Sequence, residues 1–137
     1  MTAMINSAEE FVDLRSSDRP EEYLRAARES APLEVWFDVV GKYPKMREWV
    51  ARNKTVPMQV LEQLAVDVDP RVRFAVAMKN KLSEDLMLML AQDSDASVRE
   101  RIAYNKNASD DVLRLLAQDN VRSVSAAARR QLSLRGV

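Results

Sequence analysis

Closely spaced aspartates are the residues of this chain whose type and spacing suit chemistry. The stretch LAQDSDASVR, residues 90–99, places Asp93 and Asp95 one residue apart, and LAVDVDPRVR at 64–73 and LAQDNVRSVS at 116–125 are related to it. Two carboxylates at this spacing could begin a divalent-cation site or form a general acid–base pair. Any interpretation of one stretch must hold for the other two, because the element recurs.

The second aspartate of each stretch is interpreted as a helix start. Asp69 precedes Pro70, and an acceptor side chain followed by proline is a typical beginning of a helix. Asp95 occupies the equivalent position, but the third stretch has Val121 there. A cation site would need both carboxylates and further oxygen ligands, and one copy lacks the second carboxylate. We therefore favour helix capping over metal binding or catalysis.

The first aspartate is present in all three stretches, as Asp67, Asp93 and Asp119. A carboxylate in a turn can accept hydrogen bonds from nearby backbone amides. Arg73 and Arg99 follow in the same stretches and are candidate ion-pair partners. We interpret this aspartate as a structural residue that holds the turn.

Composition removes much of the usual catalytic chemistry. The 137 residues include no cysteine, which excludes disulfides, thiolate zinc sites, thiol nucleophiles and cysteine-bound iron–sulfur clusters. They include no histidine, the commonest general base and metal ligand. No glycine-rich phosphate loop and no Gly-x-Ser-x-Gly motif occurs. We therefore expect a non-catalytic protein without a metal ion or cofactor.

The elements that position the aspartates follow from a repeat of 26 residues, the interval that separates Leu64, Leu90 and Leu116. The same interval separates Ala65, Ala91 and Ala117, then Asp67, Asp93 and Asp119, then Val72, Val98 and Val124. We expect a repeat array over residues 43–131, with full repeats at about 54–79, 80–105 and 106–131 and a C-terminal tail at 132–137.

Each repeat predicts two short helices. In the first helix, apolar residues fall at i, i+1, i+4 and i+5, which is one helical face. These residues are Val60, Leu61, Leu64 and Ala65, then Leu86, Met87, Leu90 and Ala91, then Val112, Leu113, Leu116 and Ala117. The second helices carry Val72, Ala75 and Val76, then Val98 and Ile102, then Val124, Ala127 and Ala128. Such short helices are not stable alone, so stacking of neighbouring units must bury these faces.

Capping residues mark the starts of the first helices. Thr55 precedes Pro57, and Ser83 and Ser109 are each followed by acidic residues, which suit the free amides and positive dipole end of a helix. With only two glycines and many Ala, Leu, Glu and Arg residues, the composition favours short-looped helices over hairpins. The sequence therefore predicts an all-α fold.

Residues 1–42 do not fit the repeat and are expected to form an atypical helical N-terminal cap. Ser7 and Glu10 have the spacing of a capping box, and Pro20 begins a second helical stretch. Six of the eight aromatic residues lie near this end: Phe11, Tyr23, Trp36, Phe37, Tyr43 and Trp49. They either close the exposed end of the array or form a partner-binding patch.

Residues 53–77, NKTVPMQVLEQLAVDVDPRVRFAVA, resemble the leucine-rich repeat variant, a short-unit relative of HEAT and armadillo repeats. The resemblance covers about residues 43–130. It implies a right-handed α-solenoid of short helix pairs, in which one helix of a pair can be a tighter 3₁₀ helix. The chain departs from the family in two ways: it lacks the cysteines that bind an iron–sulfur cluster in one member, and residues 1–42 do not match.

Residues near the ends of the second helices give a candidate interaction surface: Arg52, Lys54, Lys79, Lys81, Arg101, Tyr104 and Lys106. Arg101 stands where the first copy has Ala75, so it either extends to solvent or contacts a partner. Cations also suit helix C-termini, which is a purely structural explanation for this surface. The chain has 21 basic and 21 acidic residues, and this candidate surface contains one aromatic residue, so the sequence does not favour nucleic-acid binding.

The sequence predicts a single domain, residues 1–137, that acts as a non-catalytic protein-interaction module, either an adaptor or an immunity- or inhibitor-type partner protein. The alternative is a HEAT-like nucleic-acid-binding protein whose basic residues contact phosphates. No apolar run approaches the roughly 20 residues of a membrane span, so we expect a cytoplasmic protein without a membrane partner. We expect a monomer or weak homo-oligomer whose partner is another protein.

Overall fold

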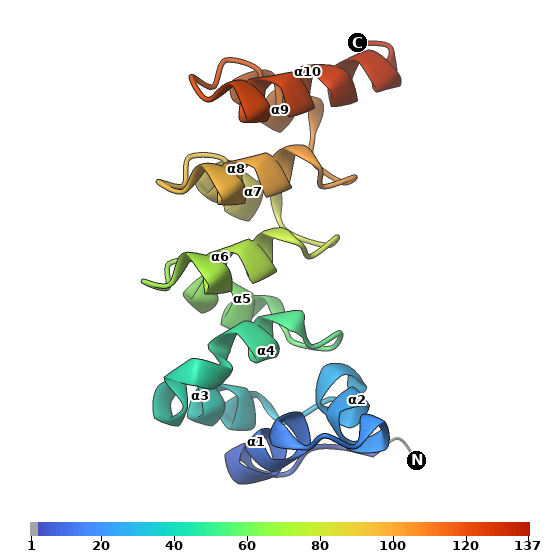
Figure 1. The fold of residues 1–137 in the computed structure, drawn as a ribbon, viewed down its shortest axis with the longest axis vertical. Helices are drawn as coiled ribbons and strands as arrows, with labels where there is room; N and C mark the ends of the chain where they lie inside the picture. Colours follow the sequence, from blue (N-terminus) through green and yellow to red (C-terminus); the bar gives the residue numbers. More distant parts are fainter. Residues whose placement is uncertain (1–2) are drawn as a thin grey trace. The chain divides into compact units, whose positions relative to one another are not determined.

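The computed structural model describes residues 3–137, so Met1 and Thr2 of the expected N-terminal cap lie outside the described residues. Over the described range, the chain folds into ten α-helices and one 3₁₀ helix, without a β-strand (Figure 1). The predicted all-α class is therefore confirmed. The helices divide into two compact units, one that ends at Val66 and one that begins at Asp67. This boundary falls inside the first expected repeat.

The first unit contains five α-helices and the 3₁₀ helix in its described part. They are α1 (Ala8–Ser16), α2 (Pro20–Arg28), α3 (Leu33–Lys42), η1 (Pro44–Met46), α4 (Arg47–Arg52) and α5 (Met58–Leu64). Helix α1 packs against α2 and α3, and α4 contacts α2, α3 and α5. Helices α1, α2 and α3 confirm that the described part of residues 1–42 is helical.

Local sequence explains how the first two helices begin. The backbone amide of Glu10 donates to Ser7 Oγ at 3.0 Å, which is the predicted N-cap of α1. The Glu10 carboxylate accepts from the amide of Asn6 at 2.9 Å, one residue before the N-cap. The predicted capping box is therefore present with its return bond shifted by one residue. Pro20 is the first residue of α2, where a missing amide costs nothing.

Two aromatic residues fill the centre of the first unit. The rings of Phe11 and Trp36 meet edge to face, with centroids 5.4 Å apart and an interplanar angle of 78°. Both side chains are fully buried, together with Val39 and Val50. Such aromatic pairs add to the stability that comes from buried apolar area alone. These two aromatics therefore belong to the core of the first unit and are not available as part of an exposed binding patch.

The second unit contains α6 (Pro70–Ala77), α7 (Glu84–Leu90), α8 (Ala96–Ala103), α9 (Asp110–Leu116) and α10 (Arg122–Arg135). Within this unit, alternate helices contact each other: α6 with α8, α8 with α10, and α7 with α9. Figure 1 shows α6, α8 and α10 in one layer and α7 and α9 in another. The helices of the predicted pairs are α-helical, and the only 3₁₀ helix in the described residues is η1.

The apolar faces predicted from the repeat are buried at every position. For the first helices of the pairs, the buried residues include Val60, Leu64, Met87, Leu90, Leu113 and Leu116. For the second helices, they include Val72, Val76, Val98, Ile102, Val124 and Ala128. A fully buried aliphatic side chain contributes about 1.5–3 kcal/mol by removal from water, so these faces supply much of the stability of each unit.

Five of the predicted helix caps are confirmed, at Ser7, Asp69, Ser83, Asp95 and Ser109, and the one at Thr55 is wrong. Ser83 and Ser109 each accept from the amide three residues on, at 3.2 Å. Helix α5, however, begins after Pro57, which is its N-cap. Thr55 lies two residues before that cap, and its hydroxyl donates to the side-chain oxygen of Asn53 at 2.7 Å instead. Proline at the N-cap position leaves α5 without a side-chain acceptor.

Helix α10 is longer than the second helices of the other pairs, with 14 residues against eight in α6 and α8. It continues through residues 132–135, which the repeat assigns to a tail, and ends at Gly136 in the left-handed region with φ 78°. A left-handed C-terminal residue is strongly favoured as glycine. No helix within residues 3–137 combines the length and apolar character needed to cross a lipid bilayer.

Two buried asparagines recur at an interval of twice the repeat and were not predicted. Asn53 donates to the backbone oxygens of Ala26 at 2.7 Å and Glu29 at 3.0 Å. Asn105 donates to the backbone oxygens of two residues 28 and 26 positions earlier, Ala77 and Lys79. Each side chain joins the end of one helix to the end of an earlier one within its own unit. Buried carbonyls that would otherwise lack a partner are satisfied in this way.

Candidate interaction site

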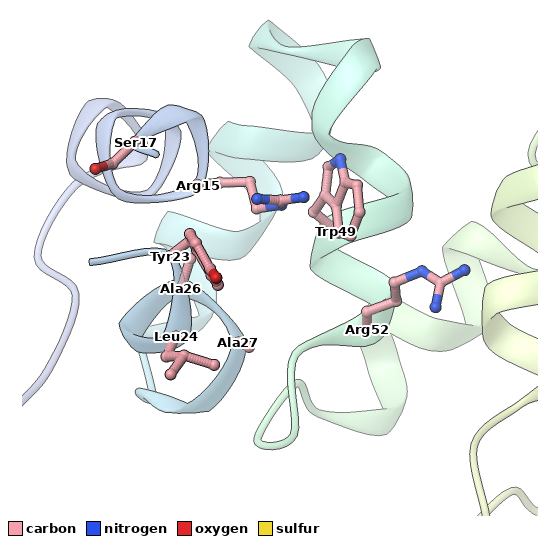
Figure 2. Close-up of a pocket in the computed structure, with 8 residues that line it drawn as sticks. All are labelled: Arg15, Ser17, Tyr23, Leu24, Ala26, Ala27, Trp49 and Arg52. Carbon is pink, nitrogen blue, oxygen red and sulfur yellow. The ribbon is translucent and has the colours of Figure 1, made fainter. Parts of the chain in front are cut away.

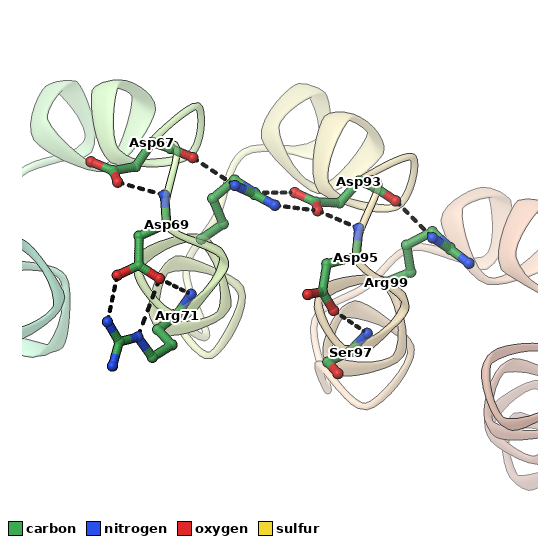
Figure 3. Close-up of polar contacts among 8 residues, drawn as sticks. Asp67, Asp69, Arg71, Asp93, Asp95, Ser97 and Arg99 are labelled. Carbon is green, nitrogen blue, oxygen red and sulfur yellow. Dashed lines mark hydrogen bonds and ion pairs between the residues drawn. The ribbon is translucent and has the colours of Figure 1, made fainter.

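The aspartate pairs are arranged as turns and helix starts (Figure 3). The carboxylates of Asp67 and Asp93 each accept from the amide two residues on, at 2.9 Å. Asp69 accepts from the amide of Arg71 at 2.9 Å, and Asp95 accepts from the amide of Ser97 at 2.8 Å. These bonds confirm both structural interpretations. No group of three or more carboxylates suited to a metal ion occurs in the part of the chain that the structure describes.

The first aspartates also form ion pairs, but between copies rather than within one. Arg73 Nε and Nη2 donate to Asp93 at 2.8 and 3.1 Å, while Arg73 Nη1 donates to the backbone oxygen of Asp67 at 2.7 Å. Arg99 repeats the arrangement with Asp119, at 2.7 and 3.2 Å. The interpretation of a carboxylate pair within one copy is therefore wrong for Arg99. The Arg99 guanidinium reaches the Asp119 carboxylate in the turn of the next copy, and from its own copy it contacts the backbone oxygen of Asp93.

Burial gives these ion pairs a structural role. The side chains of Arg73 and Asp93 are 13% and 6% exposed, and those of Arg99 and Asp119 are 14% and 10% exposed. The Arg99 guanidinium lowers the pKa of the Asp119 carboxyl below its usual value, and the amide of Val121 acts in the same direction. Charges held in two-point contact and shielded from water support the fold, with little surface left for a ligand.

The seven residues of the sequence-predicted surface fall into both units. Arg52 and Lys54 lie in the first unit, and the other five lie in the second: Lys79, Lys81, Arg101, Tyr104 and Lys106. Arg52 Nε donates to Glu48 at 3.0 Å, so its charge is partly balanced on its own helix. Arg101 is partly exposed, whereas Ala75 at the equivalent position of the first copy is buried.

Within the second unit, the loops that follow α6 and α8 lie side by side. The side-chain amide of Asn105 donates to the backbone oxygen of Lys79 at 2.6 Å, and that of Asn107 donates to the backbone oxygen of Asn80. Lys79, Lys81 and Lys106 are thus on neighbouring loops. Burial lowers the pKa of the Lys79 ammonium from 10.5 to about 8.

The first unit contains a pocket, which is a stronger candidate binding site than the basic loops of the second unit. It has a volume of about 470 Å³ and lies among α1, α2 and α4. Its lining consists of Arg15, Ser17, Tyr23, Leu24, Ala26, Ala27, Trp49 and Arg52. Figure 2 shows Arg15 reaching from α1 toward the indole of Trp49, with Arg52 on the other side of the indole in this view. The pocket therefore combines small apolar residues with two guanidinium groups and an indole.

Arg15 and Trp49 form the polar edge of this pocket. The guanidinium carbon of Arg15 lies 3.6 Å from the centroid of the Trp49 ring, and that of Arg52 lies 5.6 Å from it. The Nε atom of Arg15 is buried and has no hydrogen-bond partner among the described residues. A cation over an indole face is favourable, but it leaves the N–H donors in the guanidinium plane unused.

The walls of the pocket are held by hydrogen bonds between α2 and α4. Asn53, at the end of α4, donates to Ala26 O in α2, and the amide of Lys54 donates to Ala27 O at 2.9 Å. Ser17, at the end of α1, donates to the Glu22 carboxylate of α2 at 2.8 Å. The three helices are therefore linked directly, so the pocket is a property of the folded unit rather than of a mobile loop.

The sequence pointed to this region only in part. Tyr23 and Trp49 were among the aromatics interpreted as end cap or binding patch, and they line the pocket. Arg15 and Leu24 were not singled out. Arg15 and Trp49 are 34 positions apart in a segment without repeat register, so no spacing rule brings them together. The only sequence feature that indicated a pocket here was the clustering of aromatic residues near the N-terminal end.

Comparisons of the chain with protein-family models, with curated proteins and with solved structures find no match.

Proposed function

We propose that this protein is a non-catalytic protein-binding module, of the adaptor or inhibitor type, whose binding surface is centred on the pocket of the first unit. The supporting observation is the contact of Trp49 with two arginines beside an apolar hollow that Tyr23 also lines. Tryptophan, tyrosine and arginine are the residues most enriched where binding energy concentrates in protein interfaces. A rigid pocket also limits the ordering cost of association.

Photo-crosslinking tests this proposal, with benzoylphenylalanine placed at Leu24 or, as a matched control, at Leu115. Both leucines are partly exposed, at 37% and 42%, but only Leu24 lines the pocket. In native cells, the Leu24 variant should give a higher-mass adduct that nuclease does not shorten and that the Leu115 variant does not give. Equal crosslinking at both positions, or none at Leu24, would refute the pocket as the binding centre.

The repeat architecture belongs to the same proposal. We propose that the helix pairs form a right-handed α-solenoid of the HEAT-like, leucine-rich-repeat-variant kind. The constant 26-residue interval and the alternate helix contacts within the second unit support it. In a solenoid, a whole unit can be added without loss of cooperativity. A second copy of residues 80–105 inserted after Asn105 should therefore leave a folded, longer protein, whereas insertion of residues 80–92 alone should disrupt the second unit.

Nucleic-acid binding is a second candidate, because the loops with Lys79, Lys81 and Lys106 lie side by side. A gel shift with duplex DNA at low salt tests it. Salt-sensitive binding that is lost when Arg52, Lys54, Lys79, Lys81 and Lys106 are replaced together would favour this candidate over a protein partner. Absence of a shift would eliminate it. A cytoplasmic location and a monomer or weak homo-oligomer remain predictions, and light scattering tests the second.

A further inference from the structure

We infer that the pocket of the first unit binds an acidic segment of a partner protein, with an apolar side chain in the hollow and a neighbouring carboxylate on Arg15. This inference rests on the proposed protein-binding function and specifies the chemistry of the partner. It follows from three observations: the unused donors of Arg15, the apolar character of the hollow, and the way in which the nearby acidic residues are already engaged.

Arg15 is a cation held in place without an anion. Its guanidinium is stacked on Trp49, its Nε is buried, and no carboxylate among the described residues lies within ion-pair distance of it. Stacking fixes the plane of the guanidinium, and its Nη–H donors can hold the oxygens of a carboxylate. Because Nε is buried, the Nη–H donors of this half-buried side chain are the ones that an incoming carboxylate would reach.

The acidic side chains around the pocket already have partners. Glu48 is paired with Arg52, and Glu22 accepts from Ser17. Glu29, also on the α2 side, is paired with Arg25. None of them is paired with Arg15, so the pocket presents one guanidinium without a carboxylate partner although the first 50 residues carry three more acidic than basic side chains. An acidic ligand therefore complements this site better than a neutral or basic one.

The interior of the pocket requires an apolar group next to that carboxylate. Leu24, Ala26 and Ala27 line it from α2, and a hollow of about 470 Å³ is large enough for a leucine or phenylalanine side chain. Apolar anchors surrounded by a polar edge carry most of the affinity in protein interfaces. Nucleic acid fits less well, because Arg15 covers one face of Trp49 at 3.6 Å and so blocks base stacking there.

Selection from a displayed library of random 12-residue peptides tests the inference on the intact chain. Peptides are selected against the wild type, and the enriched ones are synthesised and measured by fluorescence anisotropy. We expect enriched sequences in which Asp or Glu lies next to Leu, Phe, Trp or Tyr. The Arg15→Gln substitution should weaken their binding about 10- to 100-fold, the usual range for a charged hydrogen-bonded contact.

Matched variants separate the role of Arg15 from general charge and from folding. Lys45→Gln removes one exposed positive charge from the same unit outside the pocket and should leave affinity within about twofold, since exposed charges contribute little. Arg15→Lys keeps the charge but not the planar two-point contact, so its affinity should fall between the wild type and Arg15→Gln. Circular dichroism of each variant shows whether the fold is kept.

Several outcomes would overturn the inference. Enriched peptides without acidic residues, or equal affinity for the wild type and a folded Arg15→Gln variant, would exclude a carboxylate on Arg15 while leaving the protein-binding function in place. If no peptide is enriched, the acidic-segment inference fails. The crosslink at Leu24 then decides separately whether a protein binds this pocket. A crosslinked product whose added mass is removed by nuclease would overturn both proposals.

Discussion

Arg15 of the first unit differs from Arg73 and Arg99 of the second unit, although all three are partly buried. In the second unit, Arg73 and Arg99 each meet a carboxylate of the next copy at 2.8 and 2.7 Å. In the first unit, Arg15 lies on Trp49 at 3.6 Å without a carboxylate. A repeated arginine has its acceptor supplied by the following copy, whereas an arginine outside the repeat has no such neighbour. The difference separates charges that hold the fold from a charge that is available to a ligand.

The largest expected effect comes from breaking an ion pair of the second unit. Asp93→Ala removes the carboxylate that two donors of Arg73 and the amide of Asp95 use. Loss of one partner of a buried pair should lower the free energy of unfolding by about 3–5 kcal/mol. The control Asp95→Ala removes only a helix cap and should cost about 1 kcal/mol. Urea unfolding followed by circular dichroism distinguishes the two, and equal losses would contradict the division of roles.

Both units should depend for stability on a buried asparagine that links the ends of two helices. Asn53→Ala and Asn105→Ala each leave buried backbone oxygens without a donor, Ala26 O in the first unit and Ala77 O in the second. We expect each to lower the free energy of unfolding by about 1–3 kcal/mol, the cost of an unsatisfied buried polar group. If one substitution were neutral in urea unfolding, its unit would not depend on this side-chain link.

Lys79 stands at the position where Asn53 and Asn105 occur, and it should make stability depend on pH. Its pKa in the folded protein is about 8, against 10.5 for an unperturbed lysine. Between pH 8 and 10.5 the unfolded chain binds more protons, so the free energy of unfolding rises with pH. Lys79→Met keeps the aliphatic stem and should remove this rise. Urea midpoints at pH 7.5 and 10 for both proteins measure it, and an identical pH dependence would contradict the assignment.

The smallest effect on stability is expected at Arg15. Arg15→Gln removes a contact with Trp49 that contributes about 0.5–1 kcal/mol and no ion pair. Arg99→Gln, which breaks a two-point contact with Asp119, should cost several times more. Thermal unfolding of the two variants compares them directly. A larger loss for Arg15→Gln would mean that Arg15 serves the fold and is not set aside for binding.

The repeat made the fold class and the buried faces predictable from sequence. Each apolar position recurs three times, so positions such as Leu64, Leu90 and Leu116 support one another, and all three are buried. The turn role of Asp93 and the caps at Asp69 and Asp95 depend on neighbouring residues and were also predictable. Local interactions and strict periodicity are what a single sequence reports well.

Interactions between distant residues were not predictable in the same way. The carboxylate partner of Arg99 is Asp119, 20 positions away, rather than the nearer Asp93, because stacking decides which turn is adjacent. The pocket depends on Arg15 meeting Trp49 across 34 positions that lack a common period. Long-range contacts of this kind are set by packing rather than by spacing. The candidate surface predicted from basic residues therefore missed Arg15.

A ¹H–¹⁵N NMR titration of the intact chain with a selected acidic peptide tests most directly whether the ligand binds at Arg15 and Trp49 rather than on the second unit. The chain has two tryptophans, Trp36 in the core and Trp49 in the pocket, so two indole N–H signals report on the first unit. The account predicts that the Trp49 signal and the Arg15 Nε–H signal move, while those of Trp36 and the amide of Asp95 stay. Shifts centred on the second unit, with Trp49 unmoved, would contradict it.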